Sequence, residues 1–229
     1  MRRIALVLAA CCGSALVAAA TAGATNECRG FQVCVPVAGP WVLAPGRVET
    51  QWHLTCPRRF VVGGLDAELT NPALDLVFRA TLGSPVNPGI STSSAADFLG
   101  RLTLGRDPAA SFRPHIGCIP AAGGGQRVPT ARRVFPPGKP TVVRASEIAV
   151  LAGRTRRVVR ACRAGEQLVA AAHAIGFYAV KPPTRELAGA VHVRRATANG
   201  RVSLVVRAGT AVAGTRTVVQ LALTCAGGS

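Results

Sequence analysis

Two pairs of cysteines with almost equal spacing constrain the fold of this chain most strongly. Cys56 and Cys118 are 62 positions apart, and Cys162 and Cys225 are 63 positions apart. The segments that follow the first cysteine of each pair also correspond. Residues 59–67 follow Cys56 at a distance similar to that at which 166–174 follow Cys162. This pattern predicts a tandem repeat, in which one unit is present twice.

The N-terminus has the features of an export signal. Arg2 and Arg3 precede an apolar stretch, 4–20, and Ala22-Gly23-Ala24 matches a small-x-small cleavage site. We expect cleavage after Ala24, leaving a secreted or cell-envelope protein without a transmembrane span. One alternative is a retained membrane helix, although the stretch is weakly hydrophobic for that role. A second is lipoprotein anchoring through Cys11, which ends a lipobox-like tetrapeptide but follows only a short apolar run.

Six cysteines remain after this cleavage, and an even number in an exported chain indicates disulfides. Six cysteines allow fifteen pairings. If each copy contains its own bridge, the pairs are Cys56–Cys118 and Cys162–Cys225, and Cys28–Cys34 closes a small N-terminal loop. A bridge that closes about 60 residues stabilises a fold by roughly 4 kcal/mol in the chain-entropy model, which is enough for a copy to be able to fold alone.

Proline and glycine mark a boundary between the copies. Residues 121–140 contain Gly123-Gly124-Gly125 and the stretch Pro136–Pro140, which disfavour both helix and central strand. We therefore predict four segments: a signal peptide at 1–24, a first β domain at 25–120, a linker at 121–140 and a second, basic β domain at 141–229.

Strand periodicity dominates both domains. Apolar residues recur at every second position, and three of the cysteines continue such inward-facing rows, as in Trp52, Leu54 and Cys56. Residues 187–195 and 201–208 alternate on either side of Asn199-Gly200, which predicts a hairpin. The Ala-rich segment 168–174 is interpreted as a strand by its correspondence with 60–69.

We therefore predict an all-β fold of two tandem, antiparallel β-sandwich-like domains, each with one internal disulfide. The spacing of the inward-facing cysteines resembles the bridge of an immunoglobulin domain. The tryptophan and tyrosine that accompany that bridge are missing, since Ile116 and Leu223 occupy the expected tyrosine positions. The strand topology therefore stays open.

Positive charge is concentrated in the second domain. Residues 25–126 contain eight basic and seven acidic residues, whereas 127–229 contain seventeen basic and three acidic ones. Arginine outnumbers lysine 25 to 2, which a GC-rich gene explains, but such a bias acts on both halves alike. Guanidinium groups bind phosphate, sulfate and carboxylate. The candidate polyanion-binding residues are Arg154, Arg156, Arg157, Arg160, Arg163, Arg194, Arg201 and Arg207.

An acidic envelope polymer or an anionic lipid surface is the expected partner of this arginine-rich face. Nucleic acid is disfavoured, because single-strand binding needs exposed aromatic side chains. The second domain has only Phe177 and Tyr178, which are candidates for the core. The alternative to a binding function is a cationic surface that only keeps the protein soluble.

A zinc site is the alternative to disulfides at two of these cysteines. His53-x-x-Cys56 and His115-x-x-Cys118 contain the ligands of a Cys2His2 zinc centre. Positions three apart on a strand point to opposite faces, so each histidine is expected to point away from its cysteine. We expect disulfides, surface histidines, and no metal or cofactor.

Catalytic signatures are weak. There is no Gly-x-Ser-x-Gly motif, and nothing in the sequence brings Ser91, His115 and Asp66 together. Asp66 and Glu68 alternate with apolar residues, as on a solvated strand face. We expect a non-enzymatic binding or structural protein. The first alternative is a secreted hydrolase, with a cavity in the first domain or between the domains that gathers at least two of His53, His115, Asp66, Asp75 and Ser91. The second is an adhesive or inhibitory module with an exposed apolar patch.

Overall fold

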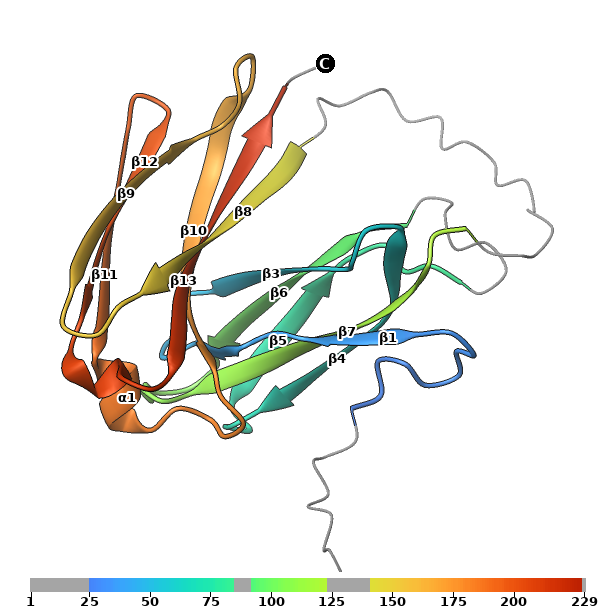
Figure 1. The fold of residues 1–229 in the computed structure, drawn as a ribbon, viewed down its shortest axis with the longest axis horizontal. Coiled ribbons are helices and arrows are strands. Elements are labelled where there is room, and N and C mark those ends of the chain that lie inside the picture. Colours follow the sequence, from blue (N-terminus) through green and yellow to red (C-terminus); the bar gives the residue numbers. More distant parts are fainter. Residues whose placement is uncertain (1–24, 85–91, 123–140, 228–229) are drawn as a thin grey trace, which may run out of the picture.

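The computed structural model describes residues 25–84, 92–122 and 141–227 (Figure 1). The described chain is all-β: thirteen strands form three antiparallel sheets, and helix is limited to one short α-helix and one 3-10 turn. The predicted signal peptide and residues 123–140 of the predicted linker lie outside the described residues.

The first half consists of two sheets that face each other. The strands β3, β6 and β5 form one sheet, and β4 pairs with β7, whose other edge pairs with β1 and β2. Trp52 and Phe98 from the first sheet and Phe112 and Ile116 from the second have no exposed surface, so the core lies between the sheets. The strand bounds are β1 Val35–Ala38, β2 Trp41–Leu43, β3 Thr50–Thr55, β4 Phe60–Leu69, β5 Leu74–Arg79, β6 Ala95–Leu102 and β7 Ser111–Pro120.

The second half has a matching arrangement. The strands β11, β12 and β9 form one sheet, which faces the strands β10, β13 and β8 of the other. Val202 and Leu204 pack against Val219 and Leu221 in the core between them. The bounds are β8 Thr141–Val150, β9 Thr155–Ala161, β10 Gln167–Tyr178, β11 Val191–Ala198, β12 Arg201–Ala208 and β13 Arg216–Ala226; α1 is Arg185–Gly189, and the 3-10 turn is Thr210–Val212.

The two halves share their strand order and one local irregularity. The order β3-β6-β5 corresponds to β9-β12-β11, and β4-β7 corresponds to β10-β13. The register of β4 shifts between Val62 and Gly64, and that of β10 shifts between Leu168 and Ala170, so both bulges follow a cysteine at the same distance.

The disulfides join the same pairs that the cysteine spacing predicts: Cys28–Cys34, Cys56–Cys118 and Cys162–Cys225. In each half the long bridge links the sheet that contains β3 or β9 to the strand β7 or β13 of the facing sheet.

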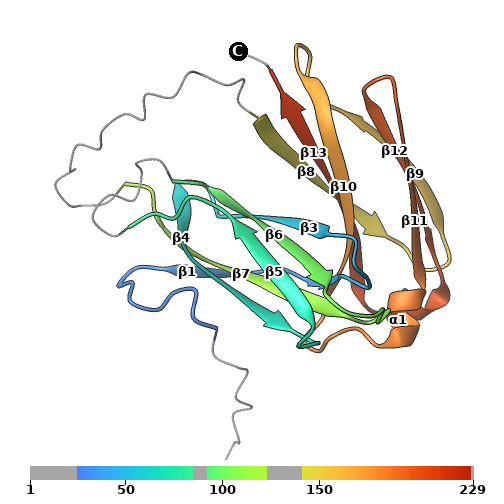
Figure 2. The same cartoon turned by 180° about the vertical axis from the view of Figure 1, so that it is seen from behind.

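The halves are joined by a shared sheet. The short strand β2 pairs with β7 on one edge and with Gly176 and Phe177 of β10 on the other, so a seven-stranded sheet spans both halves (Figures 1 and 2). Gly176 is required at this contact, because a Cβ atom there would lie 2.6 Å from Cγ of Pro40. Gln220 makes a further contact, since its Oε1 accepts from the His53 amide at 2.7 Å and its Nε2 donates to the His53 carbonyl at 2.9 Å.

The predicted hairpin forms, but its first strand is shorter than expected. Asn199 and Gly200 both have positive φ, as a two-residue turn between twisted strands requires. The strand β11 begins at Val191 rather than Leu187, because Leu187 belongs to α1. Thr184 starts this helix by accepting a hydrogen bond from the Leu187 amide at 3.2 Å. The Ala-rich segment 168–174 lies within β10, as predicted.

Candidate anion-binding face

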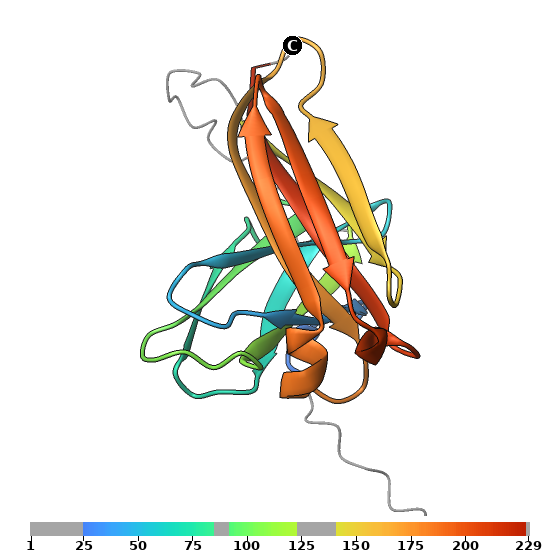
Figure 3. The same cartoon turned by 90° about the vertical axis from the view of Figure 1, so that its left-hand side faces the viewer.

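The sheet of β11, β12 and β9, which faces the viewer in Figure 3, has a basic outer face. Val202, Leu204 and Val206 of β12 point into the core, so the residues between them point outward. Residues that pair with these outward positions point to the same outer face. On β11, His192 lies opposite Arg207 and Arg194 lies opposite Val205. On β9, Arg157 lies opposite Val205 and Ala161 lies opposite Arg201. The arginine face is therefore defined by Arg157, Arg194, Arg201 and Arg207, all of which are exposed.

No carboxylate on these three strands balances this charge. The three strands contain seven arginines and neither aspartate nor glutamate. Among the described residues, none of these arginines forms an ion pair. Exposed or half-buried valine, alanine and serine side chains separate the arginines, and the strands contain no phenylalanine, tyrosine or tryptophan. The face therefore offers several free guanidinium groups on one rigid sheet.

The other predicted arginines lie beside this face rather than on it. Arg156 and Arg160 of the edge strand β9 pair with Val206 and Val202, so they are on the inner side of the sheet. Their Nη1 atoms donate to the Ala149 carbonyl at 3.4 Å and to the Val159 carbonyl at 3.1 Å, respectively. Arg154 and Arg163 flank β9 in the adjoining turns.

Arg195 was not among the predicted residues, although strand alternation indicates its position. It follows Arg194, an outward residue, and pairs with the fully buried Leu204, so it lies on the inner side of β11. A charged residue at the inward position of a strand is the sequence signal that identifies it.

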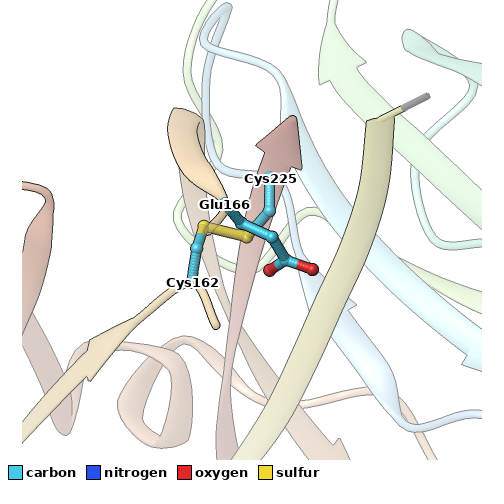
Figure 4. Close-up of side chains that lie close together, drawn as sticks. All are labelled: Cys162, Glu166 and Cys225. Carbon is cyan, nitrogen blue, oxygen red and sulfur yellow. A yellow bond between two sulfur atoms is a disulfide. The ribbon is translucent and has the colours of Figure 1, made fainter. Parts of the chain in front are cut away.

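A cluster of potential metal ligands at the second bridge is a disulfide with a neighbouring carboxylate. Ligand atoms of Cys162, Cys225 and Glu166 lie within 4.8 Å of one another (Figure 4). Both sulfur atoms belong to the bridge, so neither is a thiolate that could bind a metal. The Glu166 carboxylate accepts hydrogen bonds from the Arg144 guanidinium and from the Arg163 amide. The hydrogen bond from Arg144 is the main cause that lowers the pKa of Glu166 to about 2.

The two histidines of the hypothetical zinc centre bind carboxylates instead. The bridge between Cys56 and Cys118 leaves no thiolate for a metal. The Nδ1 atom of His53 lies 2.8 Å from Oδ1 of Asp97, and Nε2 of His115 lies 2.8 Å from Oε1 of Glu68. The prediction of surface histidines is wrong for His115, which is only 6% exposed because the N-terminal loop covers it.

The described catalytic candidates have separate partners. Asp66 lies opposite His115 in the register of β4 and β7, but its carboxylate accepts from the Asn26 amide at 2.6 Å. Asp75 pairs with Arg101 at 3.3 Å. His53 lines a groove of about 330 Å³ between β3 and β8. Ser91 lies outside the described residues.

Comparison with protein-family models, curated proteins and solved structures finds no match to this chain. Within the described residues, no helix is long and apolar enough to cross a membrane. Three disulfides are compatible with an extracytoplasmic location.

Proposed function

We propose that this chain is a secreted or cell-envelope, non-enzymatic binding protein that uses the arginine face to hold an acidic surface polymer. Residues 1–24 direct export and are removed, and the two halves derive from one duplicated unit. The observation that carries the proposal is the combination of Arg157, Arg194, Arg201 and Arg207 on one sheet without a single carboxylate.

The composition of the face favours a flexible polyanion over nucleic acid. Stacking on aromatic side chains supplies much of the affinity of single-strand binding, and the three strands have none. Guanidinium groups bind phosphate, sulfate and carboxylate through paired N–H donors, which suits a polymer whose acidic groups recur along its length. A polymer that spans the strands contacts several arginines at once.

Salt dependence tests this mode of binding. Contacts between guanidinium groups and a polyanion release counterions, so affinity falls as salt rises, and the slope reflects the number of contacts. Heparin is a suitable probe, and neutral dextran shows any binding that does not depend on charge. We expect the oxidised protein to bind heparin with a steep salt dependence and not to bind dextran.

Two sets of substitutions that remove the same amount of charge distinguish binding by the arginine face from binding by net charge. The test variant changes Arg157, Arg194, Arg201 and Arg207 to glutamine. The control variant changes four exposed arginines of the first half to glutamine: Arg29, Arg47, Arg58 and Arg79. The test variant is expected to lose about two to four units of the log-log salt slope, and the control less than one. Equal losses would show that net charge alone governs binding and would refute the proposed face.

A further inference from the structure

A second surface feature lies where the two halves meet. It is a groove of about 600 Å³, a volume typical of small-molecule sites. Its walls come from the β2–β3 loop of the first half and from β10, α1 and β11 of the second. In Figure 1 α1 lies at the base of the second half. Much of the lining is apolar, including Leu43, Val48, Ala171, Ile175 and Val191.

Unpaired strand edges create this groove. The strand β10 pairs with β2 only at Gly176 and Phe177, so 167–175 have no partner on that edge among the residues that the structure describes. Opposite to it, β11 is an edge strand of the other sheet. The two sheets of the second half are therefore not closed along this side, and the β2–β3 loop borders the opening without filling it.

The polar groups of the groove favour an anion. Arg195 lies on the inner side of β11, lines the groove and forms no ion pair within the described chain. Arg106 adds a second guanidinium at the border. Burial, with a smaller effect from the charge of Arg195, lowers the pKa of His173, so its imidazole is neutral at pH 7. Glu49 is the opposing carboxylate in the lining.

We propose that this groove binds a small amphipathic anion, with its apolar body against Leu43 and Ile175 and its acidic group on Arg195. An arginine directed toward an apolar cavity, without a carboxylate partner, is a recognition group for a carboxylate or sulfonate. The neutral imidazole of His173 adds a hydrogen-bonding group without adding charge. This surface is separate from the arginine face, so the inference does not depend on polymer binding.

Two fluorescent probes of similar shape and different charge test the proposal. The anionic probe is 8-anilinonaphthalene-1-sulfonate, and the uncharged one is N-phenyl-1-naphthylamine. We expect the oxidised protein to bind both probes, and we expect Arg195→Gln to weaken binding of the sulfonate about tenfold. The neutral probe should change by less than about twofold. The matched control is Arg79→Gln, an exposed arginine of β5 that belongs to neither the groove nor the arginine face and should leave both affinities unchanged.

Two further substitutions, at exposed positions where they should not disturb folding, change the charge of the groove in opposite directions. Glu49→Gln should tighten the sulfonate about two- to threefold by removing the opposing charge. Val48→Glu should weaken the sulfonate, and the control Val180→Glu, which is 89% exposed and does not line the groove, should not. Absence of binding to the unmodified protein, or equal effects of Arg195→Gln and Arg79→Gln on the sulfonate, would overturn the proposal.

Discussion

The two halves differ most clearly at one pair of facing residues. In the first half, Gly64 of β4 lies opposite Gly117 of β7. At the corresponding place in the second half, Ala170 of β10 lies opposite Thr224 of β13. A Cβ atom on Gly64 or Gly117 would lie 1.9 or 2.0 Å from the carbonyl oxygen of Glu27. The two glycines allow the N-terminal loop to lie directly on the sheet.

This difference changes the chemistry of the whole face. In the first half, the covering loop buries the side chains of Glu27 and His115, and Glu68 approaches the other side of the imidazole. In the second half, small residues replace this cluster, since Ala172 lies opposite Ala222. There the face meets the first half through the hydrogen bonds of Gln220. The same strand framework therefore has a face covered by the N-terminal loop in the first half. In the second half, the equivalent face contacts the first half.

The outer sheets differ in charge balance. In the sheet of β3, β6 and β5, His53 binds Asp97 and Arg101 binds Asp75, so each acidic side chain has a basic partner. The matching sheet of β9, β12 and β11 has seven arginines and no acid. The strand order alone does not determine this difference, because the inward residues define the framework and the outward residues vary freely. The asymmetry therefore supports the proposal that the second half carries the binding surface.

Removal of a long disulfide should have the largest effect on stability. The Cys56–Cys118 and Cys162–Cys225 bridges close loops of nearly equal length, so replacing either pair by serine should cost about 4 kcal/mol, against about 2 kcal/mol for Cys28–Cys34. Because β2 joins both halves into one sheet, we expect a single unfolding transition that shifts in each variant. Guanidinium unfolding and calorimetry measure this. Two separate transitions, each sensitive to one bridge, would show that the halves fold independently.

Alanine at the paired glycines should displace the N-terminal loop. Gly64→Ala and Gly117→Ala each introduce a Cβ atom against the Glu27 backbone, and such overpacking typically costs about 1–3 kcal/mol. Amide hydrogen exchange of 25–34 should become faster in both variants. The matched change in the second half, Ala170→Gly, should leave exchange in this loop unchanged. Unaltered exchange in the glycine variants would mean that the loop does not depend on the close approach.

Much of this architecture is predictable because it depends on local patterns. The cysteine spacing predicts the bridges, and alternation predicts the inward row of Trp52, Leu54 and Cys56, all of which are buried. The shared sheet is not predictable in this way. The strand β2 has only three residues, all apolar and all buried, so it shows no period that separates strand from loop. Its two partners are far apart in sequence.

The candidate sites are likewise predictable where local alternation places a residue, and not where a tertiary contact does. Alternation predicts that Arg194 and Arg207 point outward, and the register of β11 and β12 places them so. Assigning Arg157 to the face and Arg156 to its inner side requires the register of β9 with β12, which the sequence does not provide. The burial of His115 depends on a loop that packs across Gly64 and Gly117, a tertiary contact without a local signal.

The smallest expected effect is a shift in the titration of Tyr178, which lies where the two halves meet. Tyr178 is the single tyrosine of the chain, lies on β10 of the second half and packs against the core of the first. Burial, followed by the nearby Glu147 carboxylate, raises the pKa of Tyr178 to about 12. Tyrosinate absorbance should therefore rise near pH 12 in the folded protein and near pH 10 after unfolding.

Two substitutions should shift this titration in opposite directions. Glu147→Gln removes a negative charge and replaces the charged acceptor of a 3.0 Å hydrogen bond by a neutral one, so it should lower the pKa of Tyr178, though not to 10, because burial remains. Arg216 lies 4.2 Å over the tyrosine ring and lowers the pKa, so Arg216→Gln should raise it. The raised pKa also implies that stability falls above about pH 10, where the unfolded chain releases the proton and the folded chain retains it. A folded protein whose tyrosine titrates near pH 10 would show that β10 does not pack against the first half.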